Sequence, residues 1–326
     1  MHKAKINEHG AILVGKNVVC DAHDRKPIRI VTHAHSDHLL GLEKSIAECK
    51  LVLATPETKG LIGAIKGGKY LASIKSLNYK SSIEYEGEKI TFYPANHIIG
   101  SCQVLIEDSE GTRIIYTGDF KLPNAEIIQS DILVIEATYG NPNNIRPFKN
   151  TIEDEFINLV KRSLKEDSVY IFGYHGKLQE IIKILKEADI NTPIIVPEKT
   201  YEVVKVCNEY GMELKNCYLS KSEEGRQIQK DGVFIGVYHV GSSKWVGRKA
   251  IRIFLSGFEF DVPYKKIGEH EYLVALSDHA DFEQLLEYVA YSKPGLVITD
   301  NYRVGDAKAL AYEIKYRLKI EAIPMP

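Results

Sequence analysis

Seven consecutive residues near the start of the chain have the types and spacing of metal ligands. They are Thr32-His33-Ala34-His35-Ser36-Asp37-His38, which place three imidazoles and a carboxylate within six positions. Imidazole suits zinc, and a carboxylate fits a harder or bridging position. In extended backbone His33 and His35 point to one side, and Asp37 and His38 follow on the turn into the next helix. The segment can serve two metal ions; a histidine-rich surface loop is the alternative.

The elements around this segment place further polar side chains at strand ends. The apolar run 28–31 predicts a buried strand that ends at the histidine segment. His97, Asp119 and Glu136 each follow another predicted strand. Asp21 ends a strand near residues 17–20, where it could orient a histidine or simply form a turn. Polar groups at successive strand ends indicate one edge where loops converge on a site.

The composition limits the classes of protein that need to be considered. The chain has 326 residues with 44% hydrophobic composition, which suits one large or two interleaved domains. Its net charge of -2 provides no global attraction for nucleic acid, so any such binding must rest on local patches. Five cysteines without a C-x-x-C pair favour a reducing compartment. We therefore expect a cytoplasmic protein without a membrane span.

The possible metal ligands and two sequence motifs resemble those of a known protein family. Six possible ligands together resemble the metal constellation of the metallo-β-lactamase superfamily: His33, His35, Asp37, His38, His97 and Asp119. The phrase LVIEATYG at residues 133–140 resembles motif A of its β-CASP nuclease branch, and LSDHAD at residues 276–281 resembles motif C. The Ser-Asp-His-Ala-Asp wording is most similar to the DNA ligase-associated exonuclease and Artemis-like group, with a broader likeness to the mRNA 3′-end processing nucleases.

The resemblance implies an α/β fold, a four-layer αββα sandwich with an inserted small α/β β-CASP cap domain. We expect the first part of the sandwich at residues 1–165, the cap at 166–255 and the last part of the sandwich at 256–326. The sequence indicates an insertion independently, because helices and strands alternate after Asn150. That order predicts a small parallel sheet.

The resemblance also implies a set of ligands for two zinc ions, with manganese as an alternative. The first ion would be held by His33, His35 and His97. The second would be held by Asp37, His38 and His279, and Asp119 would touch both. Asp21 and Glu136 would accept ring N–H groups on the side facing away from the metal. The residues expected to serve catalysis directly are Asp37, Asp119, Glu136 and His279.

The implied activity is that of an exonuclease. A hydroxide activated by two metal ions would hydrolyse phosphodiester bonds of DNA or RNA, in DNA repair or RNA processing. Two other functions remain open: a small-molecule hydrolase resembling thioesterases or lactamases, and a non-catalytic nucleic-acid-binding subunit. The sequence leaves DNA versus RNA, the mode of cleavage and the oligomeric state undecided.

Substrate contacts have weaker signals. The predicted contacts are Ser101, Lys177, Lys244, Arg248 and Lys249. The last three surround the only tryptophan, Trp245, in a mix that suits stacking on single strands, although a solvated loop with a buried Trp is an equal alternative. Lysines and tyrosines in the segment 66–80 could also contact phosphates and bases, or form a solvated loop.

Two departures from the family pattern bear on the substrate. Many members have a Thr-His-Gly step after the last core strand, where this chain has Thr299-Asp300-Asn301. A phosphate-contacting histidine is therefore expected to be missing. Motif B has no secure position in the short cap; His270 lies nearby, with an unsuitable spacing.

Overall fold

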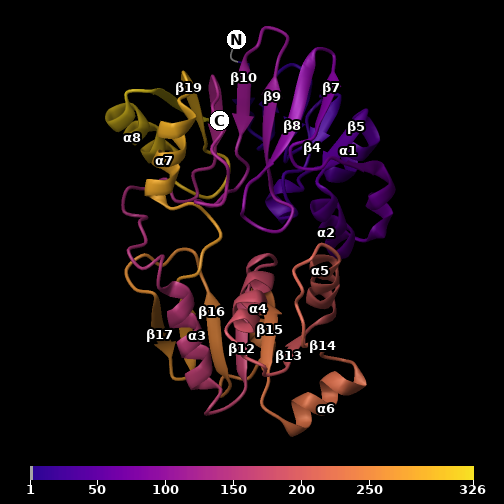
Figure 1. The fold of residues 1–326 in the computed structure, drawn as a ribbon, viewed down its shortest axis with the longest axis vertical. Helices are drawn as coiled ribbons and strands as arrows, with labels where there is room; N and C mark the ends of the chain where they lie inside the picture. Colours follow the sequence, from indigo (N-terminus) through magenta and orange to yellow (C-terminus); the bar gives the residue numbers. More distant parts are fainter. Residues whose placement is uncertain (1–2) are drawn as a thin grey trace. The chain divides into compact units, whose positions relative to one another are not determined.

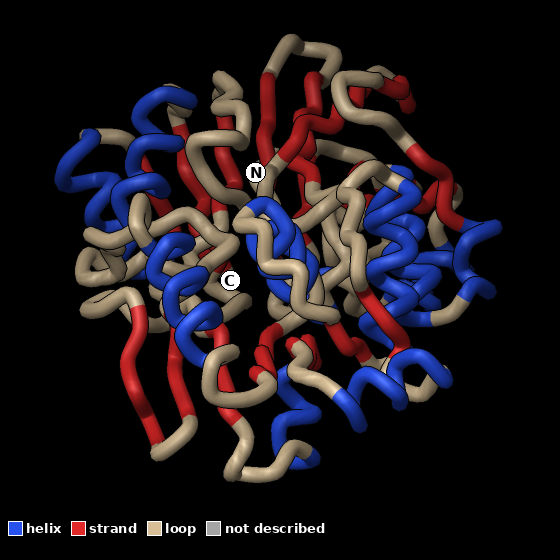
Figure 2. Tube along the Cα trace, turned by 60° about the horizontal axis from the view of Figure 1, so that its bottom comes forward, coloured by secondary structure: helices blue, strands red, loops and turns tan. Residues whose placement is uncertain are grey.

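The computed structural model describes residues 3–326. The chain divides into two compact units, each described here by itself: unit 1 comprises Met1–Ile145 and Asp278–Pro326, and unit 2 comprises Arg146–Ser277. Figure 2 shows helices in blue and strands in red along the chain. Both units contain helices and strands, and the predicted α/β fold class is confirmed.

The boundaries of unit 2 differ from those expected for the cap, which were placed after residues 165 and 255. Helix α3 (Ile152–Ser163) packs against α4 (Lys177–Glu187) and so belongs to unit 2. Strand β18 (Glu271–Val274), which was expected to return to the sandwich, pairs instead with β16 (Ile251–Leu255). Strand β17 (Tyr264–Gly268) extends the same sheet. Periodicity identifies such elements, but only pairing partners decide which unit contains them.

Unit 1 contains two sheets, whose strands run from indigo to yellow in Figure 1. The six-stranded sheet consists, in spatial order, of β1 (Ala4–Ile6), β2 (Ile12–Val14), β3 (Val18–Cys20), β4 (Ile28–Ile30), β5 (Leu51–Ala54) and β6 (Ile74–Ser76). The seven-stranded sheet has the order β20 (Glu321–Met325), β19 (Leu296–Asp300), β11 (Ile132–Ile135), β10 (Arg113–Tyr116), β9 (Cys102–Glu107), β8 (Glu88–Pro94) and β7 (Ser82–Tyr85).

The two sheets of unit 1 share an apolar core. Ile12, Ile30 and Leu53 of the first sheet are buried in one cluster with Phe92 and Val104 of the second. Such a core requires the sheets to pack face to face.

Helices cover the outer sides of this sheet pair. A second cluster joins the other face of the seven-stranded sheet to α7 (Phe282–Ser292) and α8 (Ala307–Glu313). Helices α1 (Leu42–Glu48) and α2 (Pro56–Lys66) contact β5 and β6 of the six-stranded sheet. Helix, sheet, sheet and helix thus follow one another in unit 1, which is the arrangement that the family resemblance implied.

Unit 2 is built on one sheet whose strands are parallel except at one edge. Its order is β14 (Cys217–Leu219), β13 (Ile194–Val196), β15 (Ile235–His239), β12 (Val169–Gly173), β16, β18 and β17. Only the pairing of β17 with β18 is antiparallel within the described part of this unit. Helices α4, α5 (Glu198–Glu209) and α6 (Glu223–Asp231) connect the strands, as parallel pairing demands. The expected small parallel sheet is thus a seven-stranded one.

No helix within residues 3–326 combines the length and the apolar character needed to cross a membrane.

Candidate metal centre

The predicted ligands come from loops at adjoining strand ends of unit 1. The histidine segment follows β4 of the six-stranded sheet, and His97 follows β8 of the seven-stranded sheet. Asp119 and Glu136 follow β10 and β11, which are parallel neighbours. Since β9 is antiparallel to both β8 and β10, strands β8, β10 and β11 run in the same direction and end at the same edge of the sheet. His279 arrives from the loop before α7. The sandwich therefore gathers ligands that are far apart in the sequence.

Three imidazoles converge in the geometry of a shared ion. Nδ1 of His35 lies 3.2 Å from Nε2 of His33 and 3.1 Å from Nε2 of His97. Two nitrogens bound to one tetrahedral zinc ion at its usual bond length lie about 3.3 Å apart. Oδ2 of Asp119 is 3.5 Å from Nε2 of His33 and 3.8 Å from that of His97. These four residues fit a metal ion, with one ligand atom from each within 4.8 Å of the others.

A second group of predicted ligands approaches Asp119 through the same oxygen, Oδ2. Nε2 of His38 is 3.4 Å from Oδ2 of Asp119 and 3.4 Å from Oδ2 of Asp37. This nitrogen is buried and faces both carboxylates, and neither contact meets the geometry of a hydrogen bond. His279 shares a further group with Asp119 and Glu136. Asp119 therefore contacts residues of both predicted ion sites.

Three of the histidine rings are oriented through Nδ1, the ring nitrogen that faces away from the centre. Nδ1 of His38 is 2.7 Å from Oδ2 of Asp21, and Nδ1 of His279 is 2.9 Å from Oε2 of Glu136. Nδ1 of His97 is 3.0 Å from the carbonyl oxygen of Asp278. A carboxylate or carbonyl in that place selects the tautomer whose Nε2 faces a metal. Asp21 and Glu136, the two carboxylates predicted to orient histidine rings, thus lie within hydrogen-bonding distance of ring nitrogens.

Asp21 is itself held in a full set of hydrogen bonds. Its carboxylate accepts from the backbone N–H and the hydroxyl of Thr32, at 2.9 and 2.7 Å, and from the hydroxyl of Tyr116 at 2.8 Å. Burial would raise the pKa of this carboxyl, but His38 and two arginines hold the pKa below its usual value. Asp21 is therefore a carboxylate, able to accept from the ring of His38.

Burial sets the charge state of the histidines that share an ion. It lowers the pKa of His97 to about 3 and that of His33 well below its ordinary value. Both rings are then neutral, the form that binds metal. Burial acts in the same direction on His279, but Glu136 outweighs it and raises the pKa of His279 to about 10. Burial would likewise lower the pKa of His38, but Asp119 and Asp21 hold it well above its ordinary value. The carboxylates thus favour positive charge at this site, and such a donor set suits divalent cations.

The sequence analysis missed three residues at this centre. Asp278 forms a group of metal-ligating type with His97 and His279; it lies inside the phrase that resembles motif C, and its type was the available signal. Arg29 is fully buried and donates to the carbonyl oxygen of His38 at 3.0 Å. Arg303 donates to the carbonyl oxygen of Asp37 at 3.3 Å. No pattern in the sequence marks either arginine.

The predicted substrate contacts have diverse surroundings. The hydroxyl of Ser101 is buried and accepts from the backbone N–H of His97 at 3.0 Å, so this residue shapes the ligand loop. Lys177 is also buried, within unit 2. Lys244, Arg248 and Lys249 are exposed on unit 2.

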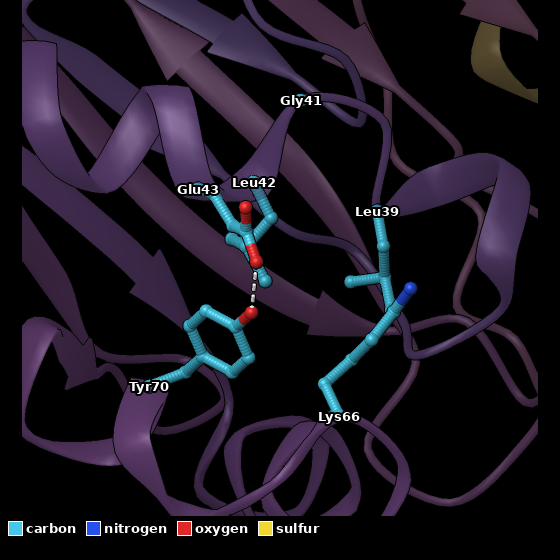
Figure 3. Close-up of a pocket in the computed structure, with 6 residues that line it drawn as sticks. All are labelled: Leu39, Gly41, Leu42, Glu43, Lys66 and Tyr70. Carbon is cyan, nitrogen blue, oxygen red and sulfur yellow. Dashed lines mark hydrogen bonds between the residues drawn. The ribbon is translucent and has the colours of Figure 1, made fainter.

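Unit 1 contains a pocket whose lining includes Leu39, the residue that follows the predicted ligand His38 in the sequence. Its volume is about 220 Å³, and it is lined by Leu39, Gly41, Leu42, Glu43, Lys66 and Tyr70. Figure 3 shows the hydroxyl of Tyr70 directed at the carboxylate of Glu43, with the chain of Lys66 extending across the other side. Two members of the basic segment noted in the sequence, Lys66 and Tyr70, therefore meet here.

The sequence of the chain is similar to those of several known proteins. No family model matches the chain. An uncharacterized protein in the lig 3′ region of Acidianus ambivalens is 38% identical over 138 residues, which are 42% of this chain and 99% of that protein. A protein named "Probable DNA ligase" from Opitutus terrae is 25% identical over 301 residues, 89% of this chain and 28% of that protein.

The chain is also similar in sequence to an RNase J-like protein and in fold to a solved structure. The RNase J-like protein of Methanocaldococcus jannaschii is 30% identical over 181 residues, 48% of this chain and 42% of that protein. The chain thus spans well under half the length of these last two relatives. A crystal structure of a protein of unknown function from Enterococcus faecalis superposes with a TM-score of 0.65 at 15% identity, covering 94% of this chain and 81% of that one. The chain belongs to the β-CASP branch of the metallo-β-lactamase superfamily.

Proposed function

We propose that the protein is a metal-dependent nuclease that hydrolyses phosphodiester bonds in DNA or RNA, acting at strand ends as an exonuclease. The observation that supports this most strongly is the convergence of ring nitrogens 3.1–3.2 Å apart in His33, His35 and His97 beside the carboxylate of Asp119. The relatives named as RNases and as a DNA ligase support a nucleic-acid substrate.

Zinc is the metal that the donor set favours, with manganese as an alternative. His33, His35 and His97 would hold one ion. Asp37, His38 and His279 would hold the other, with Asp119 contacting both. Two ions so placed lower the pKa of water and stabilise negative charge on phosphoryl oxygens.

The chain's own residues set up this chemistry. Asp21 and Glu136 hold the rings of His38 and His279 with Nε2 facing the centre. The carboxylates of Asp37 and Asp119 neutralise the charge that the ions bring, and either can accept a proton from water. Unit 2 would serve as the β-CASP cap that holds the strand, through Lys244, Arg248 and Lys249. The five free cysteines fit a cytoplasmic setting.

The test uses purified protein with end-labelled single- and double-stranded DNA and RNA, and resolves the product sizes. A ladder that shortens from one end supports the exonuclease, and internal products would show an endonuclease. Metal analysis of protein purified without chelator should find about two zinc ions per chain. Absence of any transition metal after supplementation would reject the site. Turnover of a thioester without cleavage of any nucleic acid would reject the nuclease.

A further inference from the structure

We propose that one exposed surface of unit 2 is a stacking platform for a single-stranded segment of nucleic acid. This Trp245 surface consists of Tyr174, His239, Lys244, Trp245, Arg248 and Lys249. The inference rests on the proposed nuclease function and specifies the form in which that nuclease holds its substrate.

The surface lies at the carboxyl ends of two neighbouring parallel strands. Tyr174 directly follows β12, and His239 is the last residue of β15, where it pairs with Gly173. The short helix η3 (Val240–Trp245) follows at once and packs against both strands. In open parallel sheets, ligands bind outside the carboxyl ends of the strands. The fold therefore presents these rings where such a sheet usually binds its ligand.

The aromatic side chains are exposed to an extent that folding does not require. Trp245 is 79% exposed and Tyr174 is 58% exposed. The ring of Tyr174 meets that of His239 edge to face at 5.2 Å between centroids, and Nδ1 of His239 accepts from the backbone N–H of Gly241. Exposed apolar faces that gather on one surface, rimmed by polar residues, mark an interaction site more often than singly exposed residues do.

The backbone that carries the tryptophan is anchored. Arg252 of β16 donates to the carbonyl oxygen of Ser243 at 2.9 Å, and it also pairs with Glu271 at 2.6 Å. Trp245 therefore lies on a short helix whose backbone is fixed by this hydrogen bond. A pre-positioned ring loses less conformational entropy when a base stacks on it.

The charges around Trp245 favour a polyanion. The ammonium of Lys244 lies 5.1 Å from the Trp245 ring, and Arg248 and Lys249 are exposed nearby in the chain. Within residues 3–326 none of these three cations forms an ion pair with an acidic side chain. Aromatic faces with unneutralised cations are the components of single-strand sites, in which bases stack and phosphates meet the cations.

Another exposed aromatic pair, in unit 1, shows the contrast. Tyr312 and Tyr316 are each 64% exposed and stack on one another at 6.1 Å. Two of the neighbouring cations are neutralised, because Lys315 pairs with Glu321 and Arg317 with Glu313, while Lys319 lies 5.3 Å from the Tyr316 ring. The rings of this pair are already stacked on each other, so Tyr312 serves as a control for an exposed aromatic side chain outside the Trp245 surface.

Stacking selects for a single strand, because the base faces of a duplex are covered by neighbouring bases. Trp245 is the only tryptophan in the chain, so its fluorescence reports on this surface alone. The metal-loaded protein is titrated with phosphorothioate-linked oligothymidylate and oligouridylate, which resist hydrolysis, and with a blunt duplex. We expect the single strands to quench Trp245 and to shield it from acrylamide, and the duplex to do neither.

Variants assign the binding to the ring. Trp245→Ala should weaken single-strand binding by about 5- to 150-fold, measured by anisotropy of a labelled strand. Trp245→Phe keeps an aromatic face and should recover most of this affinity, while Tyr312→Ala should leave it unchanged. A saturating single strand that leaves Trp245 fluorescence unaltered, or a duplex that quenches it equally, would overturn the proposal. These readouts do not depend on cleavage: quenching without hydrolysis would reject the nuclease alone, and hydrolysis without quenching would reject the platform alone.

Discussion

Glu136 and His279 are 143 positions apart in the sequence, yet Oε2 of the first lies 2.9 Å from Nδ1 of the second. The other oxygen of the same carboxylate accepts from the backbone N–H of Phe120 at 2.7 Å. One buried side chain thus ties the loop after β10 to the ring of a predicted ligand. Both contacts lie within unit 1.

Glu136→Gln tests the orienting role of this carboxylate. The amide keeps the shape, and its oxygen can still accept from Phe120, but the charge that fixes the His279 ring is lost. We expect metal affinity or activity to fall 10- to 100-fold, the range usual for such partners of metal ligands. Competition with a chromogenic chelator measures the affinity.

Glu88→Gln is the matched control for Glu136→Gln. Glu88 is another buried glutamate of unit 1 that accepts from two backbone N–H groups, those of Lys16 and Asn17. Its replacement should lower the free energy of unfolding without changing metal affinity. Equal losses of metal affinity in both variants would show that Glu136 acts only through stability.

Asp119→Ala removes the one ligand that contacts both ion sites. We expect fewer than two metal ions per chain, and phosphodiester hydrolysis lower by several orders of magnitude, since metal charge stabilisation contributes several kcal/mol. Metal analysis and cleavage of a labelled strand measure the two effects. Asp108→Ala, beyond the far end of β9, should change neither. Cleavage by Asp119→Ala near the unsubstituted rate would refute the bridging assignment.

Most of the predicted ligands could be named from the sequence because their chemistry is local. Three histidines and Asp37 share one short segment, and Asp119 and Glu136 stand at strand ends, where alternation and apolar runs can be recognised. His279 was assigned only through the resemblance, since nothing local shows that it meets Glu136. Arg29 and Arg303 were missed because their role follows from the backbone carbonyl groups they contact, and those contacts cannot be recognised in the sequence. The unit boundaries were misplaced because strand pairing is a non-local property.

Charge reversal of Arg248 and Lys249 to Glu tests the cations of unit 2. Each phosphate contact releases counterions, so the double variant should bind oligonucleotides more weakly and with a shallower dependence on salt. Hydrolysis of a small chromogenic phosphodiester, which needs only the metal centre, should change little. The control reverses Lys161 and Lys165, which are exposed before the amino end of β12. If both activities of the test variant fell together, the two cations would be structural.

Arg303 should hold the ligand turn in place. Its guanidinium donates to the carbonyl oxygen of Asp37 at 3.3 Å and to the carboxylate of Asp300 at 2.7 Å, and Asp300 is itself buried. Arg303→Met should release the turn and reduce the metal content of the site that includes Asp37 and His38.

The same substitution leaves the buried carboxylate of Asp300 without its partner, which should cost about 3–5 kcal/mol of stability. Loss of metal could then follow from partial unfolding alone. The double variant Asp300→Asn/Arg303→Met separates the two effects, because it removes the unpaired charge and should recover most of the stability measured by denaturant unfolding. If Arg303 positions Asp37, the double variant still binds metal poorly, and its cobalt-substituted spectrum differs from that of the unsubstituted protein. Recovery of metal binding together with stability would show that Arg303 serves the fold and not the site.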